Sequence, residues 1–292
     1  MKIKIIAIVV GLIVIGLGLY FFVFLGSGGT SPVATTTPET LKTDPQRSVI
    51  GKSVEGREIE AFTFGSGDMH IAFVGGIHGG YEWNSVLLAY EAIDHLESNP
   101  DIIPGGMRVT IIPSANPDGL ESVVGTAERF TVADVPSDVD TSAGRFNANG
   151  VDLNRNFDCN WAPEGTWRGN TVSAGSEPFS EPEADALRDF VLETNPDAVI
   201  FWHSAAGAVY GSECNEGILP GTIEIMNTYA SAAGYRAVES FDAYPITGDV
   251  EGWLASIGIP SVTVELTTHQ AVEWEKNRAG IEAVLRSAAA AR

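Results

Sequence analysis

Basic residues are scarce in this sequence. Its 292 residues include 17 Lys and Arg against 38 Asp and Glu, which gives a formal net charge of −21. Segment 46–292 alone carries −22, from 14 basic and 36 acidic residues. Such a surface repels phosphate backbones, so the composition argues against a nucleic-acid partner.

Charged residues as a whole are also few, at 19%, while hydrophobic residues make up 44%. This balance excludes disorder of the whole chain. The length suits one large α/β domain or two small ones. Only two cysteines, Cys159 and Cys214, and five histidines are present, so each of them can be considered individually.

One long apolar run lies near the N-terminus. Residues 5–25 are 21 consecutive apolar or glycine positions, enough for a helix that crosses a bilayer. Lys2 and Lys4 precede the run, so residues 1–4 are expected in the cytoplasm and the remainder outside it. The alternative is a cleaved signal peptide and a secreted protein.

Residues 26–45 are rich in Gly, Ser, Thr and Pro, which predicts a flexible linker that holds an extracytoplasmic domain over 46–292 off the membrane. In an oxidising compartment Cys159 and Cys214 are expected to form a disulfide. Two buried free thiols are the alternative.

The domain alternates predicted strands with predicted helices, which indicates an α/β fold with a sheet covered on both faces. Apolar runs bounded by Gly, Pro or Asp predict strands at 59–64, 70–75, 107–113, 198–203, 235–238 and 261–266. Helices are predicted at 83–98, 181–194, 222–233, 250–257 and 278–290, the second opened by Ser180 in a capping box with Glu183. The stretch between Pro113 and Ser180 reads as long and loop-rich, which is typical of a functional or a disordered region, and it contains the densest motif of the chain.

Two motifs place polar residues after predicted strands or within the long loop. His78 and Glu82 lie at a strand-to-helix junction, where a His and a carboxylate can converge on one cation. Asn154 and Arg155 stand side by side after Arg145, and their donors suit a planar carboxylate. Taken singly, the first motif fits a surface hydrogen bond and the second fits an exposed turn.

Two further motifs end apolar strands. His203 ends the strand at 198–203, where a lone histidine is commonly a satisfied core residue. Glu265 lies near the end of the strand at 261–266. A buried carboxylate without a partner is costly, and such groups often have a perturbed pKa and a function.

Together and in this order, the motifs resemble those of the zinc metallocarboxypeptidases of the carboxypeptidase A-like family. Segments 50–59, 116–119 and 178–183 are similar to its bacterial members, and the resemblance covers essentially all of 46–292. It implies a single domain with a mixed twisted sheet and helices on both faces. It also implies a membrane-anchored or exported peptidase with one Zn²⁺ per chain, whose catalytic domain is a monomer.

The resemblance assigns a role to each matching residue. His78, Glu82 and His203 would bind zinc, Glu265 would be the general base, and Arg145 would polarise the scissile carbonyl. Asn154 and Arg155 would hold the terminal carboxylate of the substrate, and Tyr244 would close over it. Glu251 would select the released side chain; alternatively, Asp249 and Glu251 only favour the dipole of an exposed helix start.

The sequence departs from the family pattern at two places. The spacing of His78 and Glu82 is one residue longer than usual, although the next carboxylate is as far away as Glu91. Arg145 lies closer to the Asn-Arg pair than in digestive enzymes, which leaves Arg129 as an alternative.

The other histidines and Ser204 receive simpler interpretations. His70 and His95 are expected to be structural, and His269 is expected outside the site although it could approach it. Ser204 lacks the Gly-x-Ser-x-Gly surroundings of a serine hydrolase.

The implied reaction removes the C-terminal residue of a peptide. Three protein ligands leave zinc an open position for water, whose proton Glu265 accepts. A cell-wall amidase that releases diaminopimelate, a deacylase of N-acyl amino acids and a non-catalytic binding module are the alternatives, and the full set of site residues disfavours the last.

Overall fold

A computed structural model describes residues 44–138, 140–215, 217–241 and 244–290. The expected anchor at 5–25 and nearly all of the expected linker at 26–45 lie outside these ranges, so both stay predictions. Within the described ranges, no helix is long and apolar enough to cross a membrane.

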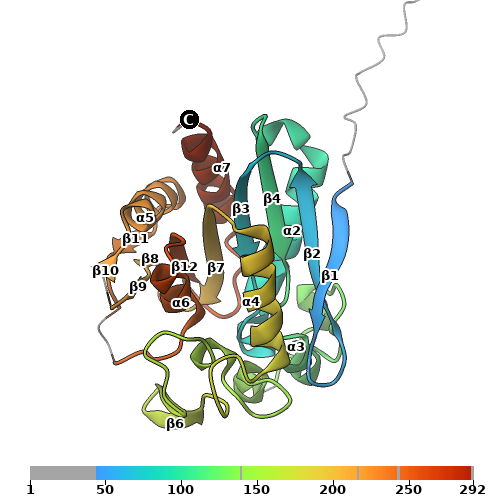
Figure 1. Ribbon diagram of the computed structural model, residues 1–292. Helices are drawn as coiled ribbons and strands as arrows, with labels where there is room; N and C mark the ends of the chain where they lie inside the picture. Colours follow the sequence, from blue (N-terminus) through green and yellow to red (C-terminus); the bar gives the residue numbers. More distant parts are fainter. Residues whose placement is uncertain (1–43, 139, 216, 242–243, 291–292) are drawn as a thin grey trace, which may run out of the picture. The chain divides into compact units, whose positions relative to one another are not determined.

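The centre of the domain is an eight-stranded mixed sheet (Figure 1). Its inner strands β4, β3, β7 and β12 run parallel. Strand β2 pairs antiparallel with β1 and β4, and β8 pairs antiparallel with β12. Strand β11 closes the other edge parallel to β8. In spatial order the strands are β1 (Gln46–Lys52), β2 (Glu58–Gly65), β4 (Met107–Ile112), β3 (Met69–Val74), β7 (Ala198–Ser204), β12 (Ser261–Leu266), β8 (Ala208–Gly211) and β11 (Arg236–Val238).

Helices cover both faces of the sheet. One hydrophobic core joins the sheet to α2 (Trp83–Ser98), α3 (Pro117–Val124), α5 (Pro220–Ala233) and α7 (Trp274–Ala290). A second core joins the opposite face to α4 (Pro182–Thr194) and α6 (Val250–Ser256). The inner strands are apolar on both faces, as expected of parallel strands buried on both sides. This architecture confirms the predicted fold class.

Short elements complete the chain. Two small hairpins consist of β5 (Glu164–Trp167) with β6 (Asn170–Ser173) and β9 (Glu213–Cys214) with β10 (Gly217–Ile218). The 3₁₀ helices are η1 (Gly79–Glu82), η2 (Pro100–Ile102), η3 (Val132–Asp134), η4 (Thr141–Arg145) and η5 (Leu153–Arg155).

The structure corrects some expected boundaries. The capping box at Ser180 is wrong, because α4 begins at Pro182 with Glu181 as its N-cap residue. Glu183 instead accepts hydrogen bonds from the Val54 N–H and the Asn147 amide. Helix α7 begins at Trp274, four residues before the expected start, and the sequence interpretation missed β1, β8, α3 and both small hairpins.

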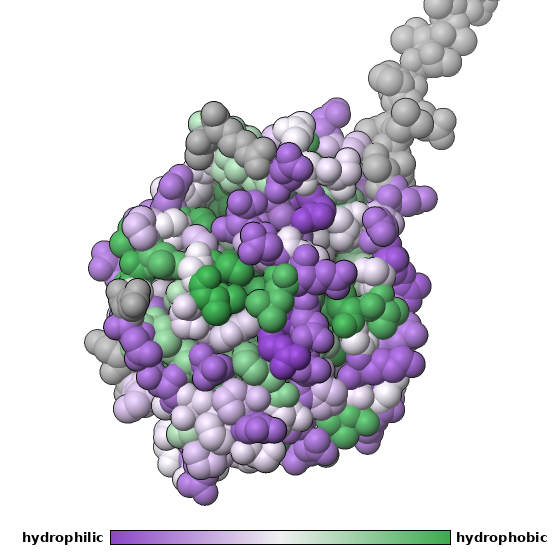
Figure 2. All heavy atoms as spheres, in the orientation of Figure 1, coloured by the Kyte–Doolittle hydropathy of each residue, from purple (hydrophilic) through white to green (hydrophobic). Residues whose placement is uncertain are grey.

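The surface agrees with the composition. Figure 2 shows that the face carrying α4 is mostly polar, with small and separate apolar patches. Among the described residues, the exposed large apolar side chains are Val49, Val54, Val132, Leu192 and Ile257.

Candidate active site

The site lies where the carboxyl ends of β3, β7 and β12 meet. After β3 the chain turns through Gly75 and Gly76, whose positive φ of 63° suits glycine, and reaches His78. A Cβ on Gly76 would approach a methyl group of Val86 to 2.7 Å, so the turn is packed tightly against α2. The turn therefore fixes the position of η1, which follows His78 and ends at Glu82.

Strand register positions the other two groups. In the parallel pair of β7 and β12, His203 lies opposite Glu265. Neighbouring strands are about 4.8 Å apart, so the two side chains necessarily reach the same edge of the sheet. His203 is buried, and Glu265 is half-buried with its Oε2 atom inaccessible to solvent.

His78, Glu82 and His203 form a compact group. Each offers a ligand atom, and these atoms all lie within 4.8 Å of one another. Among the described residues, His78 Nδ1 and Glu82 Oε2 are buried without a hydrogen-bond partner, although polar atoms in protein interiors are normally bonded. Two imidazoles and a carboxylate are also typical zinc ligands, so the residues present fit the metal.

Arg145 and Asp152 lie next to His78 of the metal-binding group. Arg145 Nε donates to Asp152 Oδ2 at 2.8 Å, and both side chains are buried. Asp152 Oδ1 lies 3.6 Å from His78 Nδ1. Burial, and after it the Arg145 cation, lowers the pKa of His78 well below its ordinary value, which keeps the imidazole neutral as a metal ligand requires.

The pKa of Glu265, and so its ability to accept a proton, depends on the charges around it. Burial, and next the Glu82 carboxylate, raises the pKa of Glu265 to about 8. Its Oε2 atom has no hydrogen-bond partner among the described residues. A cation bound by the adjacent group would favour the ionised carboxylate, because opposite charge lowers the pKa of an acid.

Asn154 and Arg155 lie in η5 at the wall of the same cavity. Asn154 Oδ1 accepts from the Val250 N–H at 2.9 Å, which ties η5 to the start of α6. Arg155 donates to the backbone oxygens of Asn154 and Thr166, and it forms no ion pair with a carboxylate of the described chain. Its charge therefore remains available to an anionic ligand.

Asp249 and Glu251, for which the sequence left two interpretations open, have different partners at the start of α6. Asp249 is the N-cap residue and accepts from the Gly252 N–H at 2.8 Å. Glu251 is 3% exposed, accepts from Thr263 Oγ1 at 2.9 Å and lies 3.2 Å from His203 Nε2. Both acids line the cavity, but only Asp249 also caps the helix.

A cavity of about 630 Å³ contains these groups. Every residue assigned above to metal, catalysis or substrate lines it, including Tyr244, which packs against Phe241. Arg129 does not line this cavity; it pairs with Asp94 and lies over the ring of Tyr90. Arg145 is consequently the better placed of the two arginines.

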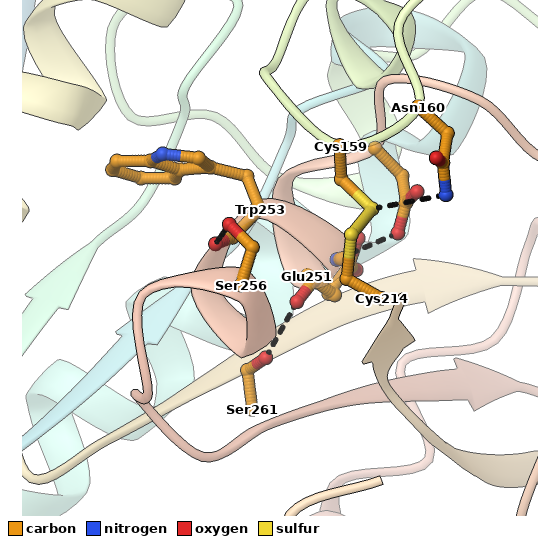
Figure 3. Close-up of a disulfide and its surroundings, with 9 residues drawn as sticks. Cys159, Asn160, Cys214, Glu251, Trp253, Ser256 and Ser261 are labelled. Carbon is orange, nitrogen blue, oxygen red and sulfur yellow. Dashed lines mark hydrogen bonds between the residues drawn. A yellow bond between two sulfur atoms is a disulfide. The ribbon is translucent and has the colours of Figure 1, made fainter. Parts of the chain in front are cut away.

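A disulfide joins Cys159 to Cys214, as the sequence analysis expected (Figure 3). It links the loop after η5 to β9, lies beside α6 near Glu251, and spans a Cα–Cα distance of 6.2 Å. Both cysteines line the cavity. The bridge therefore holds two walls of the site together.

The remaining histidines divide into two kinds. His70 is buried and bonds Thr110 Oγ1, and His95 lies beside Glu282, so both are structural as expected. His269, in contrast, lines the cavity and packs on Tyr81 with ring centroids 4.5 Å apart. The expectation that His269 lies outside the site was wrong, because the turn after β12 folds back over η1.

Ser204 is held by His269 and Asn84. Asn84 uses its amide NH₂ to donate to the backbone oxygens of Thr268 and Ala271, so its Oδ1 faces Ser204 as an acceptor. The Ser204 hydroxyl donates to this Oδ1 and lies 2.9 Å from His269 Nδ1. His269 must then donate to Ser204 rather than accept its proton. This direction is opposite to the activation of a serine nucleophile.

The sequence interpretation gave no role to some residues of the cavity wall. Tyr81 lines the cavity and lies within the first motif, and Asp152, which holds Arg145, lies within the second, so their positions in the motifs were the available signal. Trp167 and Arg168, at the turn between β5 and β6, had no such signal. The Arg145 guanidinium lies 4.8 Å from the centroid of the Trp167 ring.

Comparison with known proteins agrees with this geometry. A family model described as zinc carboxypeptidase matches residues 38–281. Carboxypeptidase B of Astacus astacus is 27% identical over 86% of this chain and 79% of its own length.

Two bacterial relatives match over smaller parts of their length. Gamma-D-glutamyl-L-diamino acid endopeptidase 1 of Lysinibacillus sphaericus is 26% identical over 76% of this chain, and bacteriocin BCN5 of Clostridium perfringens is 28% identical over 82%. The chain spans 60% of the first protein and 24% of the second.

Solved structures share the fold. Murein-tripeptide amidase MpaA from Escherichia coli O157 superimposes with a TM-score of 0.60 at 22% identity, covering 85% of this chain and 94% of that one. Thrombin activatable fibrinolysis inhibitor gives a TM-score of 0.63 at 20% identity, covering 84% and 68%.

Proposed function

This chain belongs to the zinc carboxypeptidase family, and we propose that it removes the C-terminal residue from peptides by zinc-dependent hydrolysis. One observation carries the proposal. The cavity that contains the His78, Glu82 and His203 group also contains Arg155, a guanidinium with no carboxylate partner in the described chain.

His78, Glu82 and His203 would hold the zinc ion, each through one ligand atom. A bound zinc ion supplies a Lewis acid that promotes ionisation of water and polarisation of a carbonyl group. The protein must then contribute the position of the substrate, a site for the proton and compensation of the developing negative charge.

Glu265 and Arg145 supply the last two requirements. The Glu265 carboxylate accepts the proton of the attacking water and returns it to the leaving amine. The Arg145 guanidinium, which its bond to Asp152 holds in place, stabilises negative charge on the carbonyl oxygen. Because Arg145 and the Oε2 atom of Glu265 are buried before substrate binds, little reorganisation accompanies the reaction.

Asn154 and Arg155 determine which bond is cut. A guanidinium binds a carboxylate through two parallel hydrogen bonds, so a free C-terminus is fixed against the wall. Only the last amide then lies beside the metal group and Glu265. Tyr244 lines the same wall and would close over the bound residue.

Glu251 is proposed to receive the side chain of the released residue. Its buried carboxylate lines the cavity next to Thr263, which favours a cationic group such as lysine or the free amine of diaminopimelate. This observation supports the second candidate function, a cell-wall amidase that releases diaminopimelate. A bacterial relative and a structural neighbour carry names of that kind.

The experiment that tests the proposal combines metal analysis with turnover. The full chain should bind about one zinc and hydrolyse a peptide with a free C-terminus, and a chelator should abolish hydrolysis. His203→Ala should lose metal and activity together. Full activity in the metal-free His203→Ala protein would overturn the assignment.

A second measurement tests Glu251. In the wild type, kcat/KM should be higher for C-terminal lysine than for C-terminal phenylalanine, and Glu251→Gln should reduce this ratio. Zinc content must be measured in parallel, because Glu251 also lies beside His203. An unchanged ratio with full zinc occupancy would rule out selection by Glu251.

We also propose that the domain acts outside the cytoplasm, attached to the membrane or secreted. The apolar run at 5–25 and the disulfide support this location. Protease accessibility of the domain on intact cells would test it.

A further inference from the structure

The charged groups of the cavity leave one arginine without an assigned function. Of the carboxylates that line it, Glu82 belongs to the metal group, Glu265 is the base, Asp249 caps α6, and Glu251 accepts from Thr263. Glu213 accepts from Ser240. Each acid therefore has a partner or a role.

Three arginines face these acids. Arg145 is paired with Asp152, and Arg155 is assigned to the terminal carboxylate of the substrate. Arg168 forms no ion pair within the described residues. Arg168 is exposed where it lines the cavity, so its guanidinium is open to an anionic group of a ligand.

The backbone gives an independent reason to expect a function for Arg168. Trp167 pairs with Asn170, so Arg168 and Gly169 form the two-residue loop of a hairpin, and both have positive φ, 50° and 80°. Such loops favour Asn, Asp or Gly at the first position, because other residues are strained there. Strained residues often occur at functional sites.

The position of Arg168 along the bound substrate follows from its neighbours. The proposed function places the terminal carboxylate at Arg155 and the scissile carbonyl at Arg145. The Arg145 guanidinium lies over the Trp167 ring, 4.8 Å from its centroid, and the Arg168 guanidinium lies 6.0 Å from the same centroid. Beyond the scissile carbonyl, the substrate therefore approaches the Trp167–Arg168 turn.

We propose that Arg168 binds a second carboxylate of the substrate, carried by the residue that precedes the scissile bond. This inference rests on the proposed function and specifies its substrate class. Two sources supply the chemistry: the α-carboxylate of a glutamyl residue linked through its side chain, and the side-chain carboxylate of an acidic residue in an ordinary peptide.

Matched substrates test the proposal on the zinc-loaded full chain. One substrate carries an N-acyl γ-D-glutamyl group before the last residue, and its partner carries a 4-(acylamino)butyryl group, which lacks only the carboxylate. A second pair compares aspartate with asparagine in an ordinary peptide. Preference for the acid in the first pair identifies the linked glutamyl source, and preference in the second identifies the acidic side chain.

The wild type should prefer the acid by roughly tenfold to a hundredfold in kcat/KM in one pair, as expected of a charge-assisted hydrogen bond. Arg168→Gln should bring that ratio close to one, mainly through KM. Arg168→Asn should do the same, and asparagine tolerates positive φ, so a folding defect is not the explanation. Arg286→Gln, on the exposed face of α7, is the matched control and should keep the ratio.

Binding gives a readout that does not depend on turnover. In the Glu265→Gln background, calorimetry should show weaker binding of the acid, but not of its neutral partner, after Arg168→Gln. Equal kcat/KM within both pairs in the wild type, or a ratio that survives both Arg168 variants, would overturn the proposal. Hydrolysis of the neutral substrates would still support the proposed function, so the two can fail separately.

Discussion

Two regions of the cavity differ in how their side chains are held. The strand-end group consists of His78, Glu82, His203 and Glu265, which come from the carboxyl edge of the sheet. The loop wall consists of Arg145, Asn154, Arg155, Arg168 and Tyr244, which come from the long connections. Register and burial fix the first group, whereas hydrogen bonds with backbone groups and a disulfide fix the second.

The first region carries the groups suited to catalysis, and the second carries the groups suited to binding the substrate. The strand-end group can hold a metal and accept a proton, and the backbone that carries its members is fixed by the sheet and by the turn after β3. The loop wall contributes charge and shape, and its connections tolerate change more readily than the strands do. Substitutions in the two regions should therefore affect different measured quantities.

The largest expected effect comes from the strand-end group. Glu265→Gln should retain zinc and bind substrate, yet lower kcat by about 10²–10⁴-fold, because it removes the proton acceptor. Zinc content and single-turnover kinetics on the full chain measure both quantities. If kcat decreased by less than about tenfold, Glu265 would not be the base.

The next effect comes from the disulfide that joins two parts of the wall. Replacing Cys159 and Cys214 with alanine removes a cross-link between residues 55 positions apart. The chain-entropy model predicts a loss of about 4 kcal/mol in the free energy of unfolding. Calorimetry measures this loss, and zinc should still bind because no metal ligand is altered. Identical melting temperatures for the wild type and the variant would contradict the prediction.

A smaller effect is expected at the carboxylate-binding part of the wall. Arg155→Gln should lower kcat/KM for a free C-terminus by roughly tenfold to a hundredfold, since hydrogen bonds to charged groups contribute about 1.5–3 kcal/mol. The matched control is Arg129→Gln, which lies outside the cavity and should have no such effect. If both variants behave alike, Arg155 does not bind the terminal carboxylate.

The smallest effect concerns stability of the sheet itself. Burial lowers the pKa of His70, at the start of β3, to about 4. The unfolded chain then binds a proton first, so the contribution of His70 is complete above pH 6.5 and is lost as the pH falls toward 4.

Between pH 7 and pH 5.5 this loss amounts to about 1 kcal/mol. The test measures the free energy of unfolding of the wild type and of His70→Gln at both pH values. The decrease should be larger in the wild type. A steeper decrease in the variant than in the wild type would contradict the sign of the effect.

The strand-end group could be predicted from the sequence because each member follows or ends an apolar run. His203 and Glu265 terminate short runs of β-branched and aromatic residues, and the carboxyl ends of parallel strands meet. The sequence also predicted α2 with both of its boundaries, since its apolar residues recur at helical spacing.

The loop wall was less predictable because contacts between distant segments determine it. Nothing near Arg168 indicates that its hairpin lies against Arg145, and nothing near His269 indicates that it packs on Tyr81. The edge strand β1 was missed for a related reason: it is largely exposed, so its residues lack an apolar run. In each case the pattern that predicts structure is absent from the local sequence.

The lateral pairing of His203 with Glu265 has a consequence for how the protein is made. Glu265 lies on β12, the last strand of the described chain, and a slip of one residue in its pairing with β7 would turn the carboxylate to the opposite face of the sheet. Because Glu265 follows His78, Glu82 and His203 in the chain, a nascent chain has its metal-binding group before it has its proposed proton acceptor. Hydrolytic competence would arise only when the final strand docks in register, so an activity assay during refolding would time the completion of the sheet.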